Sequence, residues 1–163
     1  MILCCGEALI DMIPTPTTAG PDGFVPHSGG AVFNTAIALG RLGVQVGMLT
    51  GLSADMFGRQ LVEALEASHV DTSHVVVSDR PTTLAFVRLV DGHATYCFFD
   101  ENSAGRMLDT AELPVLCSEV STLFFGGPEI VGHRVKRNGP GRLVKEGDEG
   151  YISSGQTTSS FVE

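Results

Sequence analysis

The sequence has no tryptophan, few basic residues and no long hydrophobic run. Its 163 residues include 10 Lys and Arg against 19 Asp and Glu, which gives a formal net charge of −9. Proteins that bind nucleic acids or anionic membranes carry basic patches, so we expect neither kind of partner. No apolar run approaches the about 20 residues of a membrane-spanning helix, and the N-terminus lacks the basic leader of a secretory signal.

Cysteine is also scarce. The four cysteines (Cys4, Cys5, Cys97 and Cys117) do not show the paired spacing of a metal site. Cys4 and Cys5 lie in an apolar run, which predicts small buried side chains rather than disulfide partners. We therefore expect no resident metal on these residues and a reducing, cytoplasmic location.

The order of the apolar segments predicts an α/β fold with a mainly parallel sheet. A nearly continuous apolar run over residues 2–10 predicts a strand that is buried on both faces, and residues 44–50 predict the next strand, ended by Gly51. Apolar residues at helical spacing predict helices over residues 30–43 and 55–68.

Residues 82–99 are rich in residue types that favour β-strands. Residues 82–90 and 93–99 are joined by Asp91-Gly92, which predicts a hairpin that lies outside the main sheet. A short helix is expected at residues 109–113 and a last strand at residues 121–125.

The composition changes near Gly127. The last 37 residues hold half of all basic residues and both lysines, and they contain no Ala, Cys or Met. We predict a boundary here, with residues 1–127 forming the folded part and residues 128–163 forming an atypical tail that is disordered or frame-altered. The alternative is an ordinary polar C-terminal extension.

The most informative local pattern is a pair of glycines before a helix. Gly29 and Gly30 let a ligand approach the backbone closely, the helix N-terminal amides can receive oxygen atoms, and Asn34 lies one helical turn further on. Asp11 is expected at the carboxyl end of the first strand, where open α/β sheets bind ligands. The pattern is neither a Walker phosphate loop nor a dinucleotide fingerprint. The alternative is a helix start with a glycine for tight packing.

Three motifs in this order resemble the PfkB, or ribokinase-like, carbohydrate kinases. They are Gly6-Glu7-Ala8-Leu9-Ile10-Asp11, Gly29-Gly30-Ala31-x-x-Asn34-x-Ala36, and Gly51-x-x-x-Asp55-x-x-Gly58. The segment Asp100-Glu101-Asn102-Ser103-Ala104 is similar to the fructokinase branch. The resemblance covers about residues 1–127. It implies the N-terminal half of a doubly wound α/β/α sandwich with a small β lid, and ATP-dependent phosphorylation of a primary hydroxyl of a sugar. Fructose is the expected sugar, and other ketoses and 2-keto-3-deoxygluconate are alternatives.

The resemblance also implies roles for particular residues. Asp11, Gly29, Gly30 and Asn34 would bind the sugar, and Phe98 would close over it, although Phe86 is an alternative that the sequence does not exclude. The lid would include the extended pieces around residues 12 and 24 and the 91–92 hairpin, and it offers a surface for a homodimer. Arg88 and the pair Glu101-Asn102 are weaker candidates. Asp55 is expected to order the turn before its helix.

The family's catalytic motif is missing from these 163 residues. The resemblance implies that an Asp-Thr-x-Gly-Ala-Gly-Asp motif supplies the catalytic base and the anion hole, and that ATP and Mg²⁺ are required; no such motif occurs here. We therefore assign no catalytic residue and expect the chain to be inactive alone. The alternatives are a non-catalytic sugar-binding or dimerisation module derived from the kinase, and a generic nucleotide-binding α/β domain.

Overall fold

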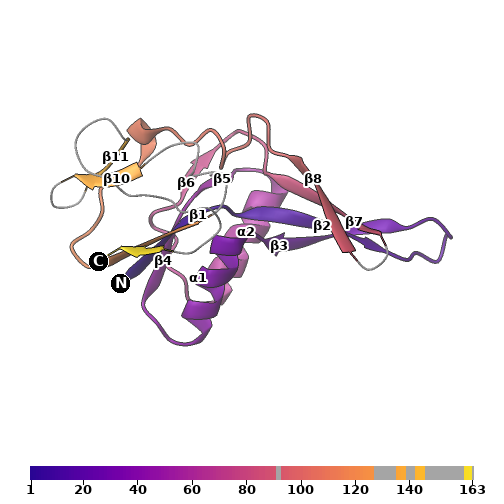
Figure 1. Cartoon of the computed structure of the whole chain (residues 1–163), viewed down its shortest axis with the longest axis horizontal. Coiled ribbons are helices and arrows are strands. Elements are labelled where there is room, and N and C mark those ends of the chain that lie inside the picture. Colours follow the sequence, from indigo (N-terminus) through magenta and orange to yellow (C-terminus); the bar gives the residue numbers. More distant parts are fainter. Residues whose placement is uncertain (91–92, 127–134, 139–141, 146–159, 163) are drawn as a thin grey trace.

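The computed structural model describes residues 1–90, 93–126, 135–138, 142–145 and 160–162 (Figure 1). The core sheet has the strand order β12-β9-β1-β4, formed by β12 (Ser160–Val162), β9 (Thr122–Gly126), β1 (Ile2–Gly6) and β4 (Val46–Leu49). β1 is parallel to both β4 and β9, whereas β12 is antiparallel to β9. The parallel centre of this sheet confirms the α/β expectation.

Both helices pack on one face of the core sheet. α1 (Ala31–Arg41) and α2 (Met56–Ala67) share a hydrophobic cluster with β1, β4 and β9. Leu61 and Leu65 are fully buried in it, as the helical spacing predicts, and each buried leucine contributes about 1.5–3 kcal/mol to folding. α1 ends before Gly43, whose φ of 79° stops the helix.

A coil segment covers the other face of the core sheet. Leu116 and Val120 pack against Leu3, Cys5 and Leu123 in a second hydrophobic cluster. The predicted helix at residues 109–113 is a single 3-10 turn, η1 (Thr110–Glu112), which begins at a capping box between Asp109 and Glu112.

The lid is a second sheet with the order β3-β2-β7-β8. Its strands are β2 (Leu9–Thr15), β3 (Gly23–Gly29), β7 (Leu84–Val90) and β8 (His93–Phe99). β7 and β8 pair in antiparallel fashion, which confirms the pairing of the predicted hairpin. Asp91 and Gly92, where the turn is predicted, lie outside the described residues. In Figure 1 this sheet extends away from the helices as an arm.

The apolar run over residues 2–10 is divided between the two sheets. β1 ends at Gly6 in the core sheet, and β2 begins at Leu9 in the lid sheet. The expectation of one strand over this run was therefore wrong. Glu7 and Ala8 form the crossing between the sheets, and the hydrophobic pattern does not reveal it because Leu9 and Ile10 are as buried as the residues of β1.

Gly51 begins a strand instead of ending one. β5 (Gly51–Ser53) pairs with β6 (Val76–Ser78) in a small parallel sheet. A Cβ on Gly51 would overlap the carbonyl oxygen of Ala104, so this residue is a close-packing position. In the C-terminal region, β10 (Val135–Asn138) and β11 (Arg142–Lys145) form a two-stranded sheet. Gly127 lies outside the described residues, and the boundary there stays a prediction.

All four cysteines are free. Cys4 and Cys5 are buried in the core sheet, as expected. Burial raises the pKa of Cys4 to about 11, and burial together with the neighbouring Cys4 raises the pKa of Cys5 well above its ordinary value, so both are neutral thiols at ordinary pH. No helix among the described residues has the length and hydrophobicity to cross a membrane.

Candidate functional site

Gly30 occupies a backbone conformation that suits glycine alone. It lies between β3 and α1 with φ 110° and ψ 139°, a region that residues with a Cβ rarely adopt. A Cβ at this position would also lie 2.8 Å from the carbonyl oxygen of Glu7. Both conditions explain the glycine at the start of α1.

Gly29 makes room for the carboxylate of Asp11. A Cβ on Gly29 would overlap Asp11 Oδ2, so the carboxylate lies directly against the glycine backbone. The carboxylate receives no hydrogen bond from the described residues. Burial raises the pKa of Asp11, and the nearby His27 opposes this shift. Asp11 is thus a partly desolvated acceptor that no donor in the described part of the chain satisfies.

Asp11 lies in the lid and not in the core sheet. It is part of β2, where it pairs with His27 on β3 and with Ala85 on β7. The expectation that Asp11 ends the first core strand was wrong, because β1 stops at Gly6. The carboxylate nevertheless meets the glycine pair, since β3 runs back along β2 to Gly29.

Asn34 lies on the first turn of α1. Its backbone N–H donates to the carbonyl of Gly30 at 2.9 Å, which places it one turn from the glycine pair. Its side chain is exposed and has no hydrogen bond with the described residues. Helical side chains lean toward the N-terminus of their helix, so the carboxamide is directed toward the Gly30 end of α1.

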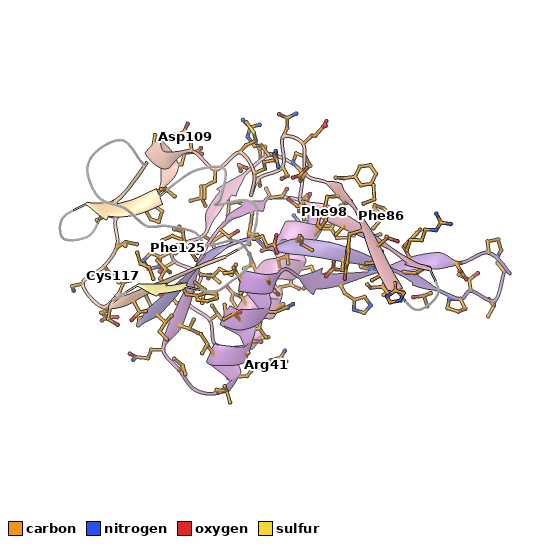
Figure 2. All side chains as sticks on the ribbon, viewed as in Figure 1. Arg41, Phe86, Phe98, Asp109, Cys117 and Phe125 are labelled. Carbon is orange, nitrogen blue, oxygen red and sulfur yellow. The ribbon has the colours of Figure 1, made fainter. Side chains whose placement is uncertain are left out.

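The strand register separates the two candidate phenylalanines. Asp11 pairs with Ala85, and Ala85 pairs with Phe98, so all three point to one face of the lid sheet. Phe86 points to the opposite face, where its ring lies 5.0 Å from that of Phe24. Figure 2 shows Phe86 and Phe98 on neighbouring strands. Phe98 therefore shares the face of Asp11, whereas Phe86 does not.

The exposure of Phe98 leaves it available for a ligand. Its side chain is 52% exposed, and its ring stacks on that of Tyr96 at 6.0 Å. Arg88 alternates with Val87 on β7, so it lies on the Phe86 face and away from Asp11.

Glu7 occupies the N-terminal end of α1. Its Oε1 accepts a hydrogen bond from the backbone N–H of Ala31 at 3.1 Å, and its carbonyl accepts one from Phe33 at 3.3 Å. The expectation that the helix amides receive ligand oxygens was wrong for these two amides. Sequence reasoning gave Glu7 no role, because a partner so distant along the chain leaves no local pattern.

Asp55 links α2 to the start of the lid hairpin. Its carboxylate accepts hydrogen bonds from the N–H groups of Phe57 and Gly58 at 2.9 and 2.8 Å, which confirms its role before the helix. It also accepts bonds from the N–H and hydroxyl of Thr82. Burial raises the pKa of Asp55, but the bonds from Gly58, Thr82 and Ser53 outweigh it and lower the pKa below its ordinary value.

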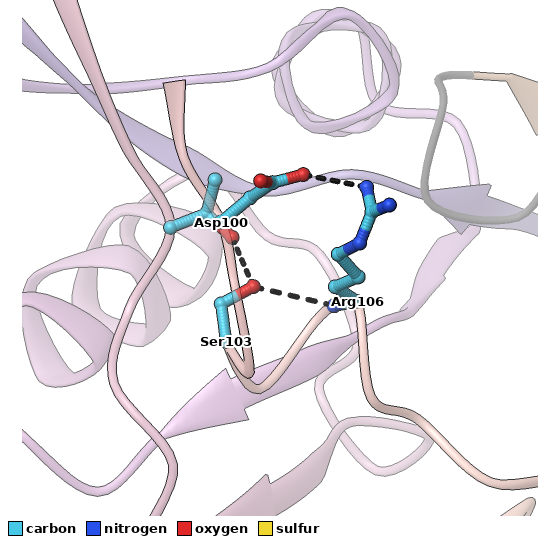
Figure 3. Close-up of polar contacts among 4 residues, drawn as sticks. Asp100, Ser103 and Arg106 are labelled. Carbon is cyan, nitrogen blue, oxygen red and sulfur yellow. Dashed lines mark hydrogen bonds and ion pairs between the residues drawn. The ribbon is translucent and has the colours of Figure 1, made fainter.

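The loop after β8 is fixed by a buried serine and an ion pair (Figure 3). Ser103 accepts hydrogen bonds from the Thr83 hydroxyl at 2.7 Å and from the N–H of Arg106 at 3.4 Å. Arg106 pairs with Asp100 at 2.7 Å. Sequence reasoning noted this segment as a family signature without its role, which is to tie the two ends of the lid hairpin together. Glu101 and Asn102 are exposed on this loop.

The described residues do not fit ATP phosphates or Mg²⁺. Among them no group of three or more His, Cys, Asp or Glu is arranged to hold a metal ion. Two of the first three amides of α1, those of Ala31 and Phe33, are already bonded to Glu7, which leaves fewer donors for a phosphate there. The residues gathered around Gly29 and Gly30 are suited instead to an uncharged polar ligand with hydroxyl groups.

The comparisons with known proteins agree with this geometry. The family model "pfkB family carbohydrate kinase" matches residues 1–134. A fructokinase from Rhizobium leguminosarum bv. trifolii is 56% identical over 131 residues, which are 80% of this chain and 40% of that protein. Fructokinase-1 from Oryza sativa subsp. japonica is 37% identical over 137 residues, or 80% and 42% of the two chains.

The chain also matches solved structures of sugar kinases. The fructokinase from Xylella fastidiosa with bound ATP is 35% identical and superposes with a TM-score of 0.64, over 69% of this chain and 37% of that one. The chain spans about two fifths of the length of the curated relatives. With a family match over most of its length and a ribokinase-like fold, the chain belongs to the pfkB family of carbohydrate kinases.

Proposed function

We propose that the chain is the sugar-recognising part of a fructokinase-type kinase, which transfers a phosphoryl group from ATP to a primary hydroxyl of fructose. The observation that carries this proposal is the Asp11 carboxylate, which lies against Gly29 and receives no hydrogen bond from the part of the chain that the structure describes. The relatives named fructokinase, and the ATP in the Xylella structure, support the choice of reaction. The four free cysteines favour a cytoplasmic location.

Each residue of the site has a chemical role in this proposal. Asp11 accepts hydrogen bonds from two adjacent sugar hydroxyls, and Asn34 both donates to and accepts from another. The backbones of Gly29 and Gly30 line the sugar site, and their missing side chains make room for the Asp11 carboxylate and for Glu7. Phe98 offers an apolar surface to the C–H groups of the sugar. These contacts bind and orient the sugar and perform no chemical step.

We expect this 163-residue chain to bind fructose without turning over ATP. It has no Asp-Thr-x-Gly-Ala-Gly-Asp motif, which the family uses for the base and the anion hole. Phosphoryl transfer depends on positioned charge at the phosphates and on that base. The non-catalytic sugar-binding module is therefore the form in which we expect the isolated chain to act.

Calorimetric titration with D-fructose tests the proposal. We expect binding by the wild-type chain and at least about tenfold weaker binding by Asp11→Asn and Asn34→Ala, since each loses hydrogen bonds to the ligand. Arg88→Ala, on the other face of the lid sheet, is the control and should bind normally. ATP binding without any effect of sugar would contradict the proposal and favour a generic nucleotide-binding domain.

We further propose that the lid mediates a homodimer. All seven residues of β8 are exposed, and they include Tyr96, Phe98 and Phe99, with exposed fractions of 52–59%. β8 is an edge strand of its sheet, and exposed apolar edge strands favour association. Tyr96→Lys should convert a dimer to a monomer in light scattering, whereas Val115→Lys, outside the lid, should not. A wild-type monomer at high concentration would contradict this.

A further inference from the structure

Glu7 connects the three segments that build the candidate site. It follows β1 and precedes β2, so it lies where the chain passes from the core sheet to the lid sheet. Its side chain and its carbonyl both accept hydrogen bonds from the first turn of α1. Ala8 and Leu9, the next residues along the chain, are 3% and 4% exposed, which anchors Glu7 in place.

α1 has no cap of its own. The residue before the helix is Gly30, which offers no side chain, and no neighbouring side chain in sequence replaces it. The first N–H groups of a helix need external acceptors, and the positive end of the helix dipole favours a carboxylate. Glu7 supplies both the acceptor and the charge from 24 residues away in the sequence.

The position of Gly30 depends on this contact. Gly30 approaches Glu7 so closely that a Cβ would lie 2.8 Å from the Glu7 carbonyl oxygen and 3.2 Å from its Cγ. The Gly30 carbonyl then accepts the hydrogen bond from the N–H of Asn34. Any shift of Glu7 is thus transmitted through Gly30 to Asn34.

We propose that Glu7 is a positioning residue for the sugar site. It fixes the first turn of α1 so that Gly30 and Asn34 are held in their binding positions before the sugar arrives, and groups fixed in advance bind with less loss of entropy. The Glu7 carboxylate accepts the N–H of Ala31 and its carbonyl accepts that of Phe33, so two of the first three helix amides serve to hold α1 in place. The inference rests on the proposed sugar binding.

Two substitutions at position 7 separate the role of the acceptor from general damage. Glu7→Ala removes the side-chain acceptor and should weaken D-fructose binding by the full chain about tenfold. Glu7→Gln keeps an oxygen acceptor for Ala31 and should restore most of the affinity. In both variants, the rate of amide hydrogen exchange at Ala31 measures whether its N–H is still bonded to the side chain at position 7. We expect faster exchange in Glu7→Ala and near wild-type exchange in Glu7→Gln.

Arg41→Ala is the matched control on the same helix. Arg41 donates a hydrogen bond to Ser68 Oγ at 3.1 Å at the opposite end of α1, so its loss destabilises the helix without touching Gly30. We expect a lowered melting temperature with unchanged fructose affinity. Equal loss of affinity in Arg41→Ala and Glu7→Ala would show a purely structural effect and overturn the proposal.

The possible failures are distinguishable. If the wild-type chain binds fructose and Glu7→Ala binds it equally well, the role of Glu7 is wrong and the proposed function stands. If amide exchange at Ala31 is unchanged in Glu7→Ala, the assignment of Glu7 as the cap of α1 is wrong. If the wild-type chain binds no fructose, the proposed function and this role fail together.

Discussion

His27 on β3 is the direct cross-strand partner of Asp11 on β2, and both side chains lie on one face of the lid sheet. Burial raises the pKa of Asp11, and the charge of His27 opposes that shift. A positively charged imidazole next to the carboxylate favours the ionised form of Asp11.

The fructose affinity should fall as the pH is lowered through the raised pKa of Asp11, because only the ionised carboxylate accepts two hydroxyl hydrogen bonds. His27→Ala should move the midpoint of this fall to higher pH, since the cation that favours the ionised form is lost. Calorimetry at a series of pH values measures the midpoint. His93→Ala, an exposed lid histidine on the other face, is the control, and an unchanged midpoint in His27→Ala would contradict the assignment.

Asp11→Asn should raise the melting temperature at neutral pH while it weakens sugar binding. The folded-state pKa of Asp11 is raised, so the ionised group destabilises the fold above that pKa, and the penalty disappears as the pH falls toward the unfolded-state value. The gain in melting temperature should therefore shrink in acid. Thermal unfolding followed by circular dichroism measures it. A lower melting temperature at pH 7 would show that Asp11 stabilises the fold.

Gly29→Ala should destabilise the protein by about 1–3 kcal/mol, as expected for an overpacked site, and should weaken fructose binding at the same time. The added methyl group would overlap the Asp11 carboxylate and push it out of position. Chemical denaturation and calorimetry measure the two effects. Gly43→Ala is the control: it has a positive φ but open space around it, so it should affect stability alone.

Asp55→Ala should lower the free energy of unfolding by about 1–2 kcal/mol, the cost of a lost helix cap, and loosen the start of β7 through Thr82. The folded-state pKa of Asp55 is lowered, so the carboxylate stabilises the fold above its unfolded-state pKa and loses this effect as the pH falls through the folded value. The difference in the free energy of unfolding between wild type and Asp55→Ala should therefore become smaller as the pH is lowered. Asp71→Ala, which loses one exposed turn hydrogen bond, should cost less.

Local patterns predicted the helices and the lid hairpin. The spacing of Leu61 and Leu65 identified the buried face of α2, and the pattern of residues 82–99 predicted the antiparallel pairing of β7 with β8. The division of residues 2–10 between two sheets was not predictable, because continuous hydrophobicity does not record which sheet a strand joins. To predict this division, one must know which strands pair with β1 and which pair with β2.

The site was only partly predictable for the same reason. Asp11, Gly29 and Asn34 stand out through motif spacing, but the choice of Phe98 over Phe86 depends on the register between β7 and β8, and alternation within one strand does not give that register. The contact of Glu7 with Ala31 joins residues that are distant in sequence, and the sequence holds no signal of it.

The crossing at Glu7 and Ala8 places the two sides of the site on different parts of the molecule. Asp11 and Phe98 belong to the lid arm, whereas Asn34 belongs to a helix that is packed on the core sheet. A sugar held by both Asp11 and Asn34 would tie the arm to the body, so sugar occupancy and arm orientation would be thermodynamically linked.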